Sequence, residues 1–282
     1  FTSRYEYSRY EIDSPLGRSL AWSRDGDTLA FFARDGRRHS LYLADVRTGA
    51  VVKRWPLVLD QPVSPSFTPD GRKLLFSAFG SGTRDIFAID LATGSVENLT
   101  NDPVYEKAPA VSPDGTMLAY SVRIGGQDKL VLSPLSDLRK KRQLTFGKGN
   151  TVTPEFSLDG KTLFFAGDAR DAYNLYSLDL ETGDVRRFTD VRTGIFFPGS
   201  LPGRPGTRIF SAFTGLDIVI VLLAWAALPA LVDEEAGQIQ VAAVAGRVIQ
   251  PDQRQFELGM PRVAGFLLRR GAKGIIDVVS IA

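Results

Sequence analysis

Chemistry in this chain could come from three kinds of residue: carboxylates at regular spacing, one histidine, and serines in glycine-rich loops. Cysteine is absent from the 282 residues, which excludes disulfides, thiolate metal sites and cysteine nucleophiles. A Ser-His-Asp system would have to use His39, because the chain has no other histidine. The sequence around it, RDGRRHSLY, predicts an exposed, charged loop between two strands. We therefore expect His39 to take no part in catalysis.

Motifs for nucleophiles, phosphates and calcium are incomplete. Gly80-Ser81-Gly82 comes nearest to the G-x-S-x-G elbow of hydrolases but lacks its pattern. Gly147-Lys148-Gly149 is too short for a phosphate-binding loop, and it leads into a strand. The stretch GDARDAYN, with Asp168, Asp171 and Asn174, lacks the glycine and terminal glutamate of an EF-hand loop. We predict no catalytic, cofactor-binding or metal-binding residues.

Most carboxylates recur at regular intervals along the chain and do not form a cluster. Asp-Gly pairs return at steps of 45, 44 and 45 residues, at Asp25-Gly26, Asp70-Gly71, Asp114-Gly115 and Asp159-Gly160. Further aspartates recur beside Thr-Gly turns, at Asp45, Asp90 and Asp179, and at the head of an expected strand, at Asp85, Asp128 and Asp217. Short side-chain acceptors at turns bond nearby backbone donors. These aspartates are therefore expected to hold the fold.

A turn that repeats every 44 to 45 residues is typical of a four-stranded β-propeller blade. The units SLAWSRDGDTLAFFA, PSFTPDGRKLLFSAF, PAVSPDGTMLAYSV and PEFSLDGKTLFFAG align as strand, turn and strand. A third strand follows in stretches such as DIFAIDLATG, and a fourth in ENLTND, RQLTFG and RRFTDV. LPGRPGTRIFSAF begins an eroded fifth unit. The predicted fold class is all-β, a propeller of four-stranded antiparallel blades with five clear repeats.

The repeat also divides the chain. We expect a lead-in or ring-closing strand over residues 1–13 and propeller repeats over 14–235. Residues 236–282 stay unassigned. The alternatives for them are a degenerate sixth blade, a linker to a missing domain, or sequence altered relative to a longer parent. The apolar run Ile218–Val232 has 15 residues and contains Pro229, whereas a membrane helix needs about 20 residues. Strands are expected there and no membrane span.

SPDGTMLAYSV, followed by an Asp-led strand and a closing LT strand, resembles the repeats of the TolB-like propellers of bacteria over about residues 14–232. The resemblance implies a ring of blades in the periplasm or cell envelope, with the cytoplasm as an alternative. It also implies a non-catalytic scaffold that mediates protein–protein interaction. Related repeats form the gating propellers of prolyl-oligopeptidase-like and tricorn-like serine peptidases. The alternative is therefore such a propeller without its catalytic domain, and a third reading is a spacer before a membrane domain.

Binding on a propeller is expected at the channel mouth, just before the innermost strand of each blade. The segments there, LDQPVSP, DPVYEKAP, KGNTVTP and RTGIFFP, differ between units. We expect a protein or peptide partner and no cofactor; nucleic acid is disfavoured because 34 Lys and Arg are balanced by 32 Asp and Glu. The alternative is that these segments are ordinary connections between blades. The candidate partner-binding residues are Tyr105, Glu106, Lys107, Asn150, Thr151, Phe196 and Phe197.

Overall fold

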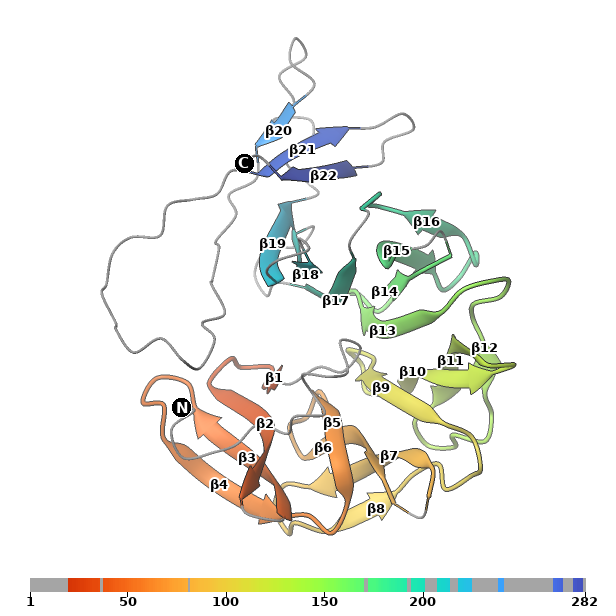
Figure 1. Cartoon of the computed structure of the whole chain (residues 1–282). Helices are drawn as coiled ribbons and strands as arrows, with labels where there is room; N and C mark the ends of the chain where they lie inside the picture. Colours follow the sequence, from red (N-terminus) through yellow and green to blue (C-terminus); the bar gives the residue numbers. More distant parts are fainter. Residues whose placement is uncertain are drawn as a thin grey trace. The chain divides into compact units, whose positions relative to one another are not determined.

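The computed structural model describes residues 20–35, 38–80, 82–169, 172–191, 194–200, 207–213, 218–224, 238–240, 266–270 and 276–280. These residues form antiparallel strands and contain no helix (Figure 1). They fall into two compact units, residues 1–160 and 161–282. The predicted all-β class, with four-stranded antiparallel sheets, is confirmed.

The first unit contains three sheets of four strands, and in each sheet the strands pair in chain order. The first sheet comprises β1 (Leu20–Trp22), β2 (Thr28–Asp35), β3 (Arg38–Asp45) and β4 (Val51–Pro56). The second comprises β5 (Asp60–Phe67), β6 (Lys73–Phe79), β7 (Arg84–Asp90) and β8 (Val96–Asn98). The third comprises β9 (Glu106–Val111), β10 (Met117–Ile124), β11 (Gln127–Pro134) and β12 (Arg142–Gln143), and β13 (Thr151–Phe156) packs against it.

The repeated aspartates hold turns, as the sequence predicts. In the β5–β6 turn, Asp70 accepts hydrogen bonds from the Thr68 hydroxyl and the Arg72 backbone N–H, and Gly71 adopts a φ of 68°. Asp90 likewise accepts from the backbone and hydroxyl of Thr93. Such local bonds satisfy backbone donors that the strands leave free.

Threonines of the closing LT segments tie each fourth strand to the third. The hydroxyl of Thr100 accepts the backbone N–H of Ile86, and Thr145 does the same for Leu130. These anchors align the repeats, so that Arg84, two residues before Ile86, corresponds to Asp128, two residues before Leu130. Asp85 and Asp128 each lie second in their third strand, β7 and β11, as expected, although the anchors place them one position apart in the alignment. Asp217 lies outside the described residues.

Large apolar side chains fill the spaces between neighbouring sheets of the first unit. The rings of Phe32 and Phe76 lie 5.1 Å apart, and those of Phe76 and Phe87 lie 5.8 Å apart. Between the second and third sheets, Ile86 and Tyr120 are fully buried. Both faces of the second sheet are therefore apolar, because each covers a neighbour.

The innermost strands share a bulge that the sequence analysis missed. Ser64, Ala108 and Thr153 have φ values of 57°, 54° and 51°, and each precedes a proline. The pairing registers of β5 with β6 and of β9 with β10 slip at this point. A bulge bends its strand and re-aims the side chains beside it.

In the second unit, one sheet segment comprises β14 (Thr162–Gly167), β15 (Asn174–Asp179) and β16 (Val185–Arg187). Two three-stranded sheets follow, β17 (Ile195–Ser200), β18 (Thr207–Phe213) and β19 (Ile218–Ala224), then β20 (Gln238–Gln240), β21 (Phe266–Arg270) and β22 (Ile276–Ser280). β19 takes the first half of the apolar run, and residues 225–232 lie outside the described part. No helix capable of crossing a membrane occurs among the described residues. The predicted boundaries at 13 and 235 stay predictions.

His39 does not occupy the exposed loop that the sequence predicts. It lies in β3 opposite Arg34, and only 8% of it is exposed. Burial lowers its pKa, and the opposing influence of nearby Asp60 is smaller. The reason for the error is that β2 and β3 extend as far as Asp35 and Arg38, so that Arg34, Asp35 and Arg38 are paired strand residues.

Candidate partner-binding site

Three connections of the first unit meet at one end of the second and third sheets (Figure 1). They are the β6–β7 hairpin, the β8–β9 connection and the β10–β11 hairpin. In an antiparallel meander these three lie at the end opposite the Asp-Gly turns. Phe79 pairs with Arg84 and Arg123 pairs with Asp128 next to the hairpins, while Tyr105 ends the β8–β9 connection.

Tyr105 is the centre of a cluster of cations at this end. Its ring centroid lies 5.8 Å from the guanidinium carbon of Arg84, 5.7 Å from that of Arg123 and 5.9 Å from Lys107 Nζ. The ring of Phe79 meets it edge-on at 6.1 Å, and Arg84 lies 4.4 Å from the Phe79 centroid. Aromatic faces attract cations, so the two rings hold the positive side chains in place.

One carboxylate serves two of these cations. Asp128, with 3% of its side chain exposed, accepts hydrogen bonds from Lys107 Nζ at 2.7 Å and Arg123 Nε at 2.9 Å. The side chain of Lys107 is 12% exposed and that of Arg123 is 48% exposed. The Lys107–Asp128 pair is thus largely out of water, while Arg123 reaches the surface.

Arg84 lacks an acidic partner within the described part of the chain. It donates from both terminal nitrogens to Gln61, to the backbone oxygen and to Oε1, each at 3.2 Å. Burial lowers its pKa, and the influence of Tyr105 opposes this effect. The neighbouring carboxylate, Asp85, accepts instead from Asn98 at 2.7 Å.

Glu106 is fully buried beside the cluster and faces a second set of residues. Its Oε1 accepts from Lys141 Nζ at 2.7 Å, and Lys141 also donates to Asp102 at 2.7 Å. Burial raises the pKa of Glu106, although hydrogen bonds from Lys141 and Thr100 oppose this. Burial lowers the pKa of Lys141, but the bonds to the two carboxylates outweigh it and leave that pKa raised.

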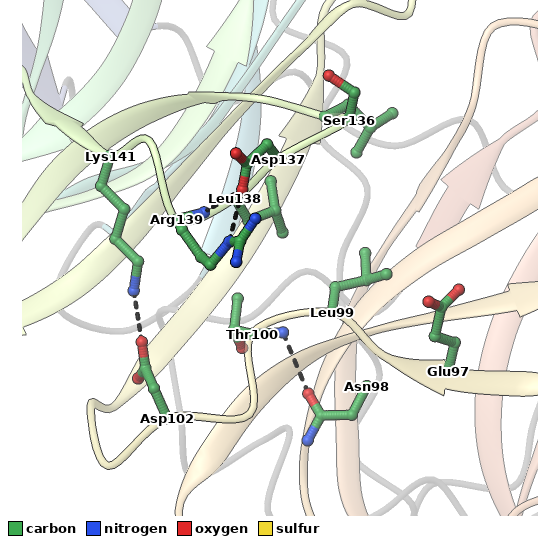
Figure 2. Close-up of a pocket in the computed structure, with 11 residues that line it drawn as sticks. Glu97, Asn98, Leu99, Thr100, Asp102, Ser136, Asp137, Leu138, Arg139 and Lys141 are labelled. Atoms are coloured by element: carbon green, nitrogen blue, oxygen red, sulfur yellow. Dashed lines mark hydrogen bonds and ion pairs between the residues drawn. The ribbon is translucent and has the colours of Figure 1, made fainter.

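A groove of about 550 Å³ runs between the β8–β9 and β11–β12 connections. Figure 2 shows Lys141 and Asp102 pointing toward one another in it, with Arg139 turned onto Asp137. Four charged groups of its walls thus form two pairs, Lys141 with Asp102 and Arg139 with Asp137. The lining residues are Glu97, Asn98, Leu99, Thr100, Asp102, Leu135, Ser136, Asp137, Leu138, Arg139 and Lys141.

The structure brings Tyr105 and Lys107 together in the cation cluster. Asn150 and Thr151 lie behind it, where Asn150 Oδ1 accepts the backbone N–H of Asp128 and the Thr151 hydroxyl donates to the Asp128 carbonyl. They fix the strand that carries Asp128.

Phe196 and Phe197 belong to the second unit. Their rings lie 6.2 Å apart, and Phe196 packs on Tyr173 at 5.0 Å. Partner contact by any of the seven candidates stays a prediction.

Sequence reasoning missed Arg84, Arg123 and Gln61, and it assigned Asp128 to the scaffold. The signal was available, because the Asp-Gly turns at Asp70-Gly71 and Asp114-Gly115 align the second and third repeats. In that alignment Gln61 corresponds to Tyr105, Phe79 to Arg123 and Arg84 to Asp128, each pair 44 residues apart. Among the described residues, no group of three or more histidines and carboxylates could hold a metal ion.

Comparison with known proteins gives one family and several relatives. The family model described as the TolB beta propeller domain matches residues 13–194. The Tol-Pal system protein TolB of Francisella tularensis subsp. tularensis is 32% identical over 101 residues, which is 35% of this chain and 22% of that protein.

Two solved structures share the fold. TolB from Acinetobacter baumannii has 24% identity and a TM-score of 0.61, over 73% of this chain and 51% of that one. The putative TolB from Agrobacterium tumefaciens has 20% identity and a TM-score of 0.61, over 74% and 77%. The match to this chain thus spans less than a quarter of the curated relative and about half of the Acinetobacter structure.

Proposed function

The chain belongs to the TolB beta propeller domain family, and on that basis we propose that it is a non-catalytic scaffold that binds a protein partner in a bacterial cell envelope. The curated relative is named as a component of a Tol-Pal system. A periplasmic location for this chain is part of the proposal.

The cluster around Tyr105 carries the proposal. Half-buried tyrosine and arginine side chains are the groups that most often anchor protein interfaces. Tyr105 is partly exposed, Arg123 reaches solvent, and Ile124 beside it is 40% exposed. The opposite end of the sheets carries the Asp-Gly turns, whose aspartates bond to groups of the same turn, as Asp70 does, and which repeat from blade to blade. The end that differs between blades is therefore the end suited to a specific partner.

Site-specific photocrosslinking in the cells that encode the protein tests this function. A benzoylphenylalanine at Tyr105 is expected to crosslink the chain to a protein, and the same group at exposed Thr93, at the opposite end of the same sheet, is expected not to. Fractionation of the cells checks the envelope location. Crosslinks of equal yield from both positions, or none from Tyr105, would contradict the proposal.

A further inference from the structure

Arg84 is a buried cation whose charge is not balanced. Only 6% of the residue is exposed, and its hydrogen bonds go to neutral groups of Gln61. Its Nε has no hydrogen-bond partner in the described part of the chain. A charge taken out of water without a counter-ion is costly. The position therefore fits a residue that awaits an anion.

The neighbouring charges do not supply that anion. Asp128 is engaged by Lys107 and Arg123, so Arg84 is the one of the three cations around Tyr105 without a carboxylate. Asp85 is bound to Asn98. Glu106 and Asp102 are both bound to Lys141. With one carboxylate against three cations, the cluster carries two net positive charges.

Arg84 begins β7, directly after the β6–β7 hairpin. Gly80 and Gly82 there are exposed, so these two residues place no side chain over the guanidinium. The rings of Phe79 and Tyr105 flank it. An incoming group would meet a planar cation framed by two aromatic rings.

We propose that Arg84 receives a carboxylate side chain of the partner protein, and that this contact selects an acidic partner segment; the inference rests on the proposed function. The planar guanidinium matches the two oxygens of a carboxylate, and charge-assisted pairs of this kind are strong and directional. The flanking rings suit the apolar stem of a glutamate or aspartate. A carboxylate is favoured over a phosphate because the proposed partner is a protein.

Peptide display tests the inference. The full chain is used to select binding peptides from a random dodecapeptide library. The affinities of the selected peptides are then measured for the wild-type protein, for Arg84→Gln and for the control variant Arg72→Gln. Arg72 is exposed and lies at the opposite end of the same sheet. Selected peptides are expected to share an acidic residue, and replacing that residue by its amide should weaken binding at least about tenfold.

Arg84→Gln should weaken binding by the same factor, and Arg72→Gln should not. Arg84→Gln combined with the amide-substituted peptide should cost no more than either of these two changes alone. Arg84→Lys, which keeps the buried charge, serves if Arg84→Gln fails to fold, and is expected to weaken binding less. Peptides that depend on Tyr105 but not on Arg84 would overturn this inference and leave the proposed function standing. Selection of no peptide would count against both. Binding to phosphatidylglycerol vesicles that Arg84→Gln abolishes would overturn the carboxylate assignment in favour of a phosphate.

Discussion

We predict that removing the charge of Asp128 lowers the free energy of unfolding more than removing the charge of Lys107, although the two residues form one ion pair. Replacing Asp128 by asparagine keeps the side-chain shape but removes the carboxylate that faces Lys107 and Arg123. Lys107 would then keep its charge without this carboxylate, on a side chain that is only 12% exposed. Breaking a buried pair in this way typically costs about 3–5 kcal/mol. We expect Asp128→Asn to fall at the lower end of that range.

Lys107→Met should cost less. Asp128 would still face Arg123 at 2.9 Å and would still be held through its backbone by Asn150. The loss is one charge-assisted hydrogen bond, worth about 1.5–3 kcal/mol. In the double variant no lysine is left without a counter-ion, so adding Lys107→Met to Asp128→Asn should recover part of the stability.

Urea unfolding of the full chain and its three variants, followed by tryptophan fluorescence, measures these free energies. The expected order of stability is wild type, Lys107→Met, the double variant and Asp128→Asn. Strict additivity of the two single changes, or equal losses from both, would refute the reasoning, because contacting partners must couple.

Three further predictions concern the scaffold. Gly183→Ala should cost about 1–2 kcal/mol in urea unfolding, because Gly183 has a φ of 81°, which alanine adopts only with strain; no heavy atom lies near an added Cβ. Gly94→Ala should cost about 1–3 kcal/mol more, because Gly94 has a similar φ and an added Cβ would also meet the indole ring of Trp55. Ala108→Gly should be nearly neutral, since φ is 54°, whereas Ala110→Gly in the same strand should cost about 0.5–1 kcal/mol. Hydrogen bonds from backbone and side chain lower the pKa of Asp90 below its ordinary value of 3.8. The stability it supplies is present above that value and lost as pH falls through the lowered pKa, so Asp90→Asn should lower the melting temperature at pH 7 and converge with wild type in acid.

The sequence predicted the scaffold well because each scaffold contact is local. Asp70 bonds residues two positions away on either side, and the Asp-Gly turn needs only its own glycine. Such contacts repeat with the sequence and can be found by aligning the chain with itself. His39 shows the limit of this approach, since its burial depends on how far two strands continue and not on the residues beside it.

The candidate site was predicted less completely because its contacts join different repeats. Arg84 and Tyr105 come from different connections, and Lys107 reaches Asp128 across 21 residues. The sequence grouped Tyr105 and Lys107, which the structure brings together, but it did not indicate that the Glu106 side chain contacts Lys141. Alternation along the strand places Glu106 and Lys107 on opposite faces, but their partners, Lys141 and Asp128, are distant in the chain and are not revealed by composition or periodicity.

The aligned repeats suggest how one scaffold can acquire a specific surface. The threonine anchors fix the third strand in the same place each time, at Ile86, Leu130 and Leu175. Two residues earlier the side chain is free to vary, and it is Arg84, Asp128 and Tyr173 in successive repeats. A cation without a counter-ion in one repeat therefore lies near a carboxylate shared by two cations in the next. Because the backbone is held by the anchors, such changes alter the charge pattern at this end of the sheets without altering the fold.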